Sequence, residues 1–257
     1  MLLAVDIGNT HITIGLFKGK DIVNNLRIST DIKKTEDEYA TSILYPLSKI
    51  GIDASHVKSV VISSVVPTLT VIFRKLSFRY LDIEPMIVDI NTKTQISLKV
   101  DNPKEIGVDR IVNAVAIQKL YGVPAIVVDF GTATTFDVIS KDNEYIGGII
   151  TPGIELVSHV LHAKTAKLPE VEIAKIENII GKNTIDSMKS GIYYGYLSMI
   201  DGIIERVIES GLIGKDMHIV STGGYGDIFV EDSKFIERYE PLLTLIGLKI
   251  IYEENCI

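Results

Sequence analysis

Three short segments of this 257-residue chain combine glycine with aspartate or hydroxyl residues in a way that suits phosphate and metal binding. They are Asp6-Ile-Gly-Asn-Thr, Asp129-Phe-Gly-Thr-Ala-Thr-Thr and Ser221-Thr-Gly-Gly, and each follows an apolar run typical of a buried strand. An aspartate at a strand end can hold Mg²⁺, usually through water, while neighbouring backbone N–H groups and hydroxyls bind phosphate oxygens. Three such loops suit one phosphorylated ligand held between two halves of a molecule.

The chain contains neither of two common phosphate-binding motifs. No Gly-Lys pair of the chain stands in the context of a P-loop, and Gly224 and Gly226 lack the third glycine of a dinucleotide-binding turn. A P-loop nucleoside triphosphatase and a dinucleotide-dependent enzyme are therefore both disfavoured. The groups that the first segment and the next strand offer to phosphate belong to Asp6, Gly8, Asn9, Thr10 and Thr13.

Strands and helices alternate along the chain, and the loops lie where strands end. After the first apolar run, Ile12, Ile14 and Leu16 alternate with other residues, which predicts a hairpin. Further strands are expected over 57–65, 125–128, 136–139, 145–150 and 218–220. Helices are expected over 35–50, 67–80, 103–120, from 152, over 185–210 and from 241.

The segments that begin at Asp6 and Asp129 share one pattern, in which an apolar strand is followed by Asp, a large apolar residue and Gly. Their spacing of 129 − 6 = 123 residues is about half of the chain, which would suit two duplicated domains. Two unrelated strand ends that share Asp-x-Gly would give the same pattern. The third glycine segment favours duplication.

Composition limits the class of protein. Lys and Arg number 26 against 33 Asp and Glu, so the formal net charge is 26 − 33 = −7, which is unfavourable for a nucleic-acid binder. A single cysteine, Cys256, excludes an intramolecular disulfide framework. No charge-free stretch has the roughly 20 apolar residues of a membrane span, so we expect a soluble, cytoplasmic protein without membrane or nucleic-acid partners.

Further motifs surround these loops, and together they carry a resemblance to a known family. In the order and spacing of its motifs, from Asp6 to about Leu248, the chain resembles type III pantothenate kinases. That family belongs to the acetate and sugar kinase/Hsp70/actin superfamily. Besides the three loops, the motifs are Asn102-Pro, Gly107-Val-Asp-Arg, Asn113-Ala-Val-Ala, Tyr145-Ile-Gly-Gly, Thr151-Pro-Gly, Ala166-Lys-Leu-Pro and Gly181-Lys-Asn-Thr.

The resemblance implies an α/β fold of two duplicated ribonuclease-H-like, actin-like ATPase domains around a central cleft, which we expect over residues 1–118 and 119–257. It implies ATP-dependent phosphorylation of pantothenate to 4′-phosphopantothenate, the first step of coenzyme A biosynthesis. A homodimer, Mg²⁺ and a monovalent cation, K⁺ or NH₄⁺, are expected with that activity.

The resemblance also assigns roles to residues. Asp109 would be the general base, although its position alone fits a surface aspartate at a helix start. Asp129 would bind the monovalent cation, and Asp6 would bind magnesium through water. Thr184 would contact pantothenate, but alone it indicates an ordinary helix N-cap. The pantothenate-binding set is Gly107, Val108, Asp109, Arg110 and Thr184, and the ATP-binding set is Asp6, Gly8, Asn9, Thr10, Thr13, Thr132, Gly223 and Gly224.

The chain departs from the family pattern at two positions. Val100 stands where some members carry an aromatic residue, and Thr13 stands where some carry a lysine, although Lys18 lies nearby in sequence. Because a fold does not determine a substrate, three alternatives stay open. They are a kinase for another small hydroxy compound, an actin- or Hsp70-like ATPase without a small-molecule acceptor, and a regulatory protein without catalysis.

Overall fold

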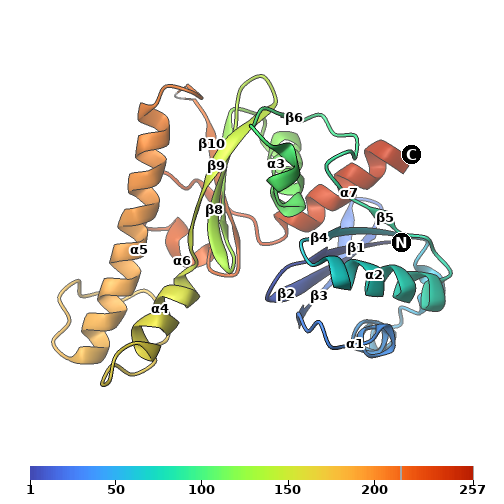
Figure 1. The fold of residues 1–257 in the computed structure, drawn as a ribbon, viewed down its shortest axis with the longest axis horizontal. Helices are drawn as coiled ribbons and strands as arrows, with labels where there is room; N and C mark the ends of the chain where they lie inside the picture. Colours follow the sequence, from blue (N-terminus) through green and yellow to red (C-terminus); the bar gives the residue numbers. More distant parts are fainter. Residues whose placement is uncertain (215, 257) are drawn as a thin grey trace. The chain divides into compact units, whose positions relative to one another are not determined.

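The computed structural model describes residues 1–214 and 216–256, which form two compact units (Figure 1). The first unit contains Met1–Ile96, Asp101–Ala116 and the segment from Leu243. The second contains Ser97–Val100 and Ile117–Leu242. Each unit has its own sheet and its own apolar core.

The first unit is built on a five-stranded mixed sheet in the order β3-β2-β1-β4-β5. β1 pairs antiparallel with β2, β2 pairs antiparallel with β3, and β4 and β5 continue parallel to β1. β1 and β4 are largely apolar and run parallel, so Asp6 of β1 and the serines Ser63 and Ser64 of β4 lie toward the same end of the sheet. The strands are β1 (Leu2–Ile7), β2 (His11–Lys18), β3 (Asp21–Ser29), β4 (Ser59–Ser64) and β5 (Met86–Ile87).

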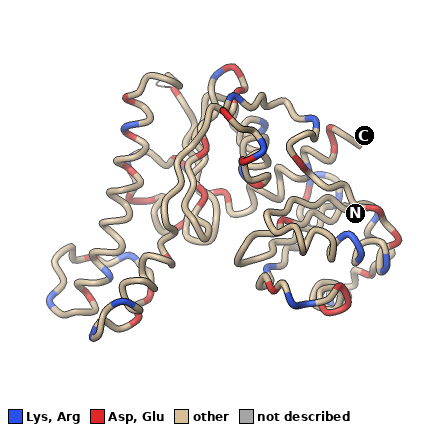
Figure 2. The backbone as a smooth tube through the Cα atoms, viewed as in Figure 1, with Lys and Arg blue, Asp and Glu red and all other residues tan. Residues whose placement is uncertain are grey.

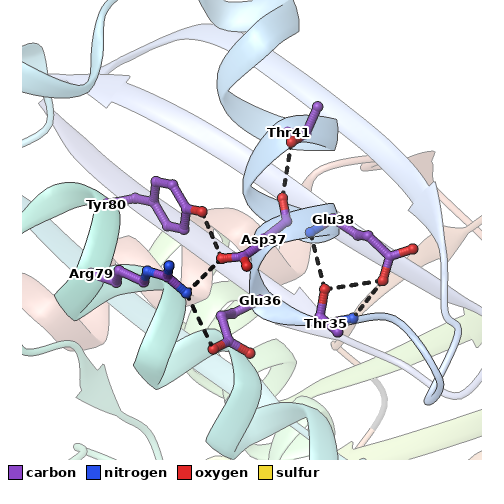
Figure 3. Close-up of polar contacts among 7 residues, drawn as sticks. All are labelled: Thr35, Glu36, Asp37, Glu38, Thr41, Arg79 and Tyr80. Atoms are coloured by element: carbon purple, nitrogen blue, oxygen red, sulfur yellow. Dashed lines mark hydrogen bonds and ion pairs between the residues drawn. The ribbon is translucent and has the colours of Figure 1, made fainter.

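Three helices lie wholly in this unit: α1 (Glu36–Lys49), α2 (Pro67–Leu76) and α7 (Leu243–Cys256). α1 begins at a capping box in which Thr35 and Glu38 satisfy each other's backbone N–H groups (Figure 3). α2 begins with proline at its first turn and passes into one π-helical turn, Ser77–Leu81, at the point where a continuous α-helix was expected. Arg79 and Tyr80 of that turn bond to Asp37 on α1, which ties the two segments together (Figure 3).

The second unit repeats this topology. Its strands run in the order β11-β10-β7-β8-β9-β6, and β7 pairs antiparallel with β8 and parallel with β10, as β1 does with β2 and β4. The order 9-8-7-10-11 therefore matches 3-2-1-4-5, which confirms the predicted duplication. The strands are β6 (Ser97–Leu98), β7 (Ala125–Phe130), β8 (Ala133–Ile139), β9 (Glu144–Pro152), β10 (His218–Gly223) and β11 (Arg238–Tyr239).

The helices of the second unit are α4 (Ile154–Ala163), α5 (Thr184–Glu209) and the single turn α6 (Asp227–Val230). An aromatic cluster packs α5 and α6 against the sheet, where Phe229 lies between the rings of Phe130, Tyr193 and Tyr196 at centroid distances of 5.3, 5.4 and 5.7 Å. The remaining helix, α3 (Val108–Leu120), begins in the first unit and continues into the second after Ala116. Two short 3₁₀ turns complete the list, Ala54–His56 and Pro103–Glu105.

The C-terminal helix belongs to a different unit from the one that the predicted domain division at residue 118 implied. α7 was expected in the second half, yet it belongs to the first unit and contacts β1, β2 and β4. The cause is its apolar face, since Leu243, Leu245, Leu248 and Ile251 are all 1% exposed or less. Covering one sheet face with this helix removes those side chains from water.

Charged residues of both signs are scattered over both units (Figure 2). Within the described residues, no helix is both long and apolar enough to cross a membrane.

Candidate functional site

Asp6 lies near the carboxyl end of β1, in the middle of the first sheet. Its strand neighbours in register are Thr13 on β2 and Ser63 on β4. Ser63 is fully buried, and its hydroxyl donates a hydrogen bond of 2.6 Å to Oδ1 of Asp6. The Asp6 residue as a whole keeps some exposure to solvent.

The loop after β1 turns tightly around Gly8. Its N–H donates to the carbonyl oxygen of His11 at 3.0 Å, and a Cβ at position 8 would lie 3.0 Å from that oxygen. Thr30 donates to the Gly8 carbonyl at 2.7 Å and so holds the loop from β3. Asn9 and Thr10 are exposed at the tip, where a ligand can reach them.

Asp109 lies in the first turn of α3, in the same unit as Asp6. Its Oδ1 accepts the Arg110 N–H at 2.9 Å and also lies close to the backbone of Gly107. A Cβ on Gly107 would lie 2.4 Å from that oxygen, so only glycine leaves room for the carboxylate in this position. The same imagined Cβ would be 3.7 Å from Val65, directly after β4, which places the start of α3 beside the end of that strand.

Both carboxylates have raised pKa values. Burial raises the pKa of Asp6 from 3.8 to about 7, against the lowering effect of the Ser63 hydrogen bond, and the nearby charge of Asp109 raises it further. Burial also raises the pKa of Asp109, although the Arg110 N–H and guanidinium act in the opposite direction. A carboxylate with a raised pKa is a stronger base than an ordinary aspartate.

The second unit brings Asp129 and Gly223 together at the ends of β7 and β10. Gly223 has φ +84°, and a Cβ there would lie 2.6 Å from Oδ1 of Asp129 and 2.6 Å from the Phe130 carbonyl oxygen. The Gly224 N–H donates to that carbonyl at 3.0 Å, and the Tyr239 hydroxyl donates to the Gly223 carbonyl at 2.8 Å. The loops that follow β7 and β10 therefore lie in contact within the second unit.

The other two expected residues of this unit lie apart in sequence. Thr132 is exposed in the turn between β7 and β8, where its carbonyl accepts the Gly153 N–H at 3.2 Å. Thr184 is the first residue of α5, and the N-cap is Asn183, not Thr184, because the Asn183 side chain accepts the Asp186 N–H at 2.9 Å. Thr184 lines a cavity of about 660 Å³ between α4 and α5.

The donor groups fit some cations better than others. In the described ranges 1–214 and 216–256, no three His, Cys, Asp or Glu side chains gather to hold a metal. Asp6 supplies one carboxylate and Asp109 a second negative charge near it. That set suits Mg²⁺, which takes one or two carboxylates and keeps waters and substrate phosphates as its other ligands. Asp129 supplies a single carboxylate, which lies beside Gly223.

The fold and these loops together define a class of protein. Two ribonuclease-H-like units, with Asp6 near the end of β1 and Asp129 near the end of β7, have the fold of actin-like ATPases and sugar kinases. Component A of the (R)-2-hydroxyglutaryl-CoA dehydratase from Acidaminococcus fermentans has this fold at a TM-score of 0.59 and 15% identity, over 100% of this chain and 99% of that one.

Sequence comparison narrows the class to one family. A family model described as type III pantothenate kinase matches residues 2–206. The type III pantothenate kinase of Geotalea daltonii is 45% identical over 255 residues, 99% of each chain, and that of Finegoldia magna is 46% identical over 256 residues, 99% of this chain and 98% of the other. The chain belongs to the type III pantothenate kinase family.

Proposed function

We propose that the protein transfers the γ-phosphoryl group of ATP to the primary hydroxyl of pantothenate and releases 4′-phosphopantothenate and ADP. The observation that carries this proposal is the partly buried Asp109 at the start of α3, in the unit whose phosphate loop contains Asp6. Membership of the family supports the choice of acceptor.

In the proposed reaction Asp109 is the general base. The hydroxyl oxygen of pantothenate attacks the γ-phosphorus, the bond from that phosphorus to the β,γ-bridging oxygen breaks, and the hydroxyl proton moves to the Asp109 carboxylate. The raised pKa of Asp109 favours that transfer. Arg110, next in the helix, presents a guanidinium that can pair with the carboxylate of pantothenate. Gly107 and Val108 would complete this side of the acceptor site.

The loop after β1 would bind the phosphates. Gly8 keeps the turn tight, and the exposed Asn9 and Thr10 offer N–H and side-chain donors. Thr13 lies beside Asp6 on the next strand, where its hydroxyl can reach the same ligand. Lys18 lies at the far end of β2, five residues beyond Thr13, so we give it no role in phosphate binding.

We propose Asp6 as the residue that holds Mg²⁺ through water and Asp129 as the ligand of K⁺ or NH₄⁺. A divalent ion on the phosphates neutralises charge that develops during transfer. The negative charge of Asp109 near Asp6 supports this assignment, because a cation would relieve the repulsion between the two carboxylates. In the second unit, Thr132, Gly223 and Gly224 would contact ATP.

We also propose a homodimer in which Thr184 contacts pantothenate. Apolar side chains on α4 and α5 lie exposed, and a second copy of the chain would cover them. Leu156, Val160 and Ile185 are 46%, 46% and 49% exposed. Light scattering of the purified protein at several concentrations tests this, since a monomer at all of them would contradict it.

A coupled assay of ADP release separates the proposed reaction from its rivals. We expect release that needs both Mg²⁺ and pantothenate, and little release without an acceptor. Release that does not depend on any acceptor would support the ATPase alternative. Release with a different hydroxy compound and not with pantothenate would support another small-molecule kinase.

A further inference from the structure

The side chain of Asp6 is hydrogen-bonded to a buried hydroxyl on the neighbouring strand β4. Ser63 is fully buried in β4, and its hydroxyl donates to Oδ1 of Asp6 at 2.6 Å. The residues before it in β4, Val60, Val61 and Ile62, are apolar and at most 2% exposed. A hydroxyl in such a strand is unfavourable unless it is hydrogen-bonded, and Asp6 provides the acceptor.

The register of the two sheets places hydroxyl residues beside both aspartates. Asp6 stands between Thr13 on β2 and Ser63 on β4, and Asp129 stands in the same way between Thr135 on β8 and Thr222 on β10. Residues that pair across neighbouring strands project from the same face of a sheet. In both halves of the duplicated fold, hydroxyl residues therefore lie on either side of the aspartate. Most of the residues that precede the aspartate in its own strand are apolar.

The hydrogen bond restricts how the Asp6 carboxylate can turn. Oδ1 is held from the neighbouring strand, so the plane of the carboxylate is set by β4 as well as by its own backbone. Without that bond the side chain could turn away from the charge of Asp109, which lies near it. A carboxylate that binds a hydrated ion and phosphates needs a fixed orientation, because such sites lose affinity when a supporting hydrogen bond is lost.

We propose that Ser63 is a positioning residue that orients Asp6 for binding of magnesium and ATP phosphates. The proposal rests on the phosphate-binding role given to Asp6 above. It assigns to Ser63 no contact with substrate.

The test compares Ser63→Ala and Ser63→Thr with the wild-type protein. Calorimetry would measure the binding of a non-hydrolysable β,γ-imido analogue of ATP in the presence of Mg²⁺, and the coupled assay would measure KM for each substrate. We expect Ser63→Ala to weaken analogue binding about tenfold or more and to raise KM for ATP. KM for pantothenate should change less than about twofold, and Ser63→Thr should restore most of the binding, because it keeps a hydroxyl of the kind that the second unit has at Thr222.

A matched control separates positioning from simple loss of packing. Ser77 is 1% exposed in the same unit and donates to the Ile83 carbonyl at 2.7 Å, so Ser77→Ala also removes a buried hydroxyl. It should lower the melting temperature without changing analogue binding.

Wild-type analogue affinity in Ser63→Ala, or equal losses in Ser63→Ala and Ser77→Ala, would overturn the positioning role. If wild-type protein binds the analogue but does not phosphorylate pantothenate, the proposed function fails while the binding test of Ser63 still stands.

Discussion

Two aspartates of the first unit are held in states that an exposed aspartate does not have. Asp6 is bonded from behind by Ser63 and has a pKa of about 7, while Asp109 fills the space over Gly107 and also has a raised pKa. Both shifts have burial as their largest cause, and Asp109 adds repulsion at Asp6. The side chains are therefore prepared to bind a cation or accept a proton, at a cost to stability.

Asp109→Asn tests the general base. The amide keeps the size of the side chain but cannot accept the hydroxyl proton, so kcat should fall by at least about a hundredfold. Affinity for the β,γ-imido analogue of ATP should stay within a few-fold of wild type, as measured by calorimetry. A kcat close to wild type would show that Asp109 is not the general base. Glu105 is an exposed acidic residue of the preceding turn, so Glu105→Gln serves as the neutral control.

Asp6→Asn tests the cost of the buried charge. In metal-free protein the raised pKa of Asp6 favours its protonated form in the fold, so its contribution to stability is present below about pH 4 and is lost as the pH rises through 7. The asparagine variant has no such dependence. We expect it to exceed wild type by about 1–3 kcal/mol at pH 8 in EDTA and to match it near pH 4.

Chemical denaturation at both pH values would measure that difference. A variant that is less stable than wild type at pH 8 would show that Asp6 is ionised at no cost to the fold. The same variant should bind Mg²⁺ and the ATP analogue poorly, which links the lost stability to function.

At the scale of elements, α3 and α7 pack more closely than ordinary helices. A Cβ on Gly247 of α7 would lie 2.3 Å from the Val112 carbonyl oxygen of α3, and Thr244 donates to Asn113 at 2.8 Å one turn earlier. Both contacts lie within the first unit, and α3 carries Asp109 in its first turn. The C-terminal helix therefore helps to hold the helix that bears the proposed base.

Gly247→Ala tests that packing against a second helical glycine. In an open helix the change from glycine to alanine is stabilising by up to about 1 kcal/mol. Gly195 of α5 has no atom within 4 Å of an added Cβ, so Gly195→Ala should raise the melting temperature. Gly247→Ala should lower the melting temperature and reduce the unfolding free energy by about 1–3 kcal/mol, because the Val112 carbonyl oxygen must move. Equal effects of the two changes would contradict close α3–α7 packing.

Most elements could be predicted from local patterns, and the failures have physical causes. The hairpin after Leu2, the capped helix α1 and the strand before Asp129 follow directly from periodicity and caps. β5, β6 and β11 have two residues each, too few for any pattern. The place of α7 depends on which sheet face needs covering, which no local pattern encodes.

The loops of the proposed site stand out in the sequence, whereas the residue that supports Asp6 does not. Asp6, Asp109 and Asp129 stand out beside glycines in short motifs, and the family resemblance supplied their roles. Ser63 did not stand out, because a serine inside the apolar run of 57–65 gives no sign of its partner 57 residues away. Its only signal is that a buried hydroxyl needs an acceptor.

At the scale of the whole molecule, duplication has given two aspartates in matching positions and different surroundings. Asp6 has a second carboxylate near it, whereas Asp129 lies against the backbone of Gly223. The proposed Mg²⁺ site has two carboxylates near each other, and the proposed monovalent site has one. The halves would thus share a fold and differ in the cation that each binds.

Replacing Asp129 tests this division of roles. We expect activity of the wild-type protein to rise with KCl at constant ionic strength, and Asp129→Asn to lose that response while still needing Mg²⁺. The coupled assay, with choline chloride as the balancing salt, measures both. A potassium response that persists in Asp129→Asn would place the monovalent site elsewhere.

The net charge of −7 is compatible with binding ATP, although ATP is itself a polyanion. The expected site neutralises phosphate with cations, hydroxyls and backbone N–H groups, so it needs no basic patch. Acidity therefore disfavours nucleic acid as a partner without disfavouring a nucleotide.

The most direct measurement is identification of the product made from ATP and pantothenate with Mg²⁺ and K⁺ present. Mass spectrometry and ³¹P NMR should show one phosphate ester on the primary hydroxyl of pantothenate for each ADP released, and Asp109→Asn should form it far more slowly. ADP without that ester, or equal rates in the two proteins, would contradict phosphoryl transfer to pantothenate with Asp109 as its base.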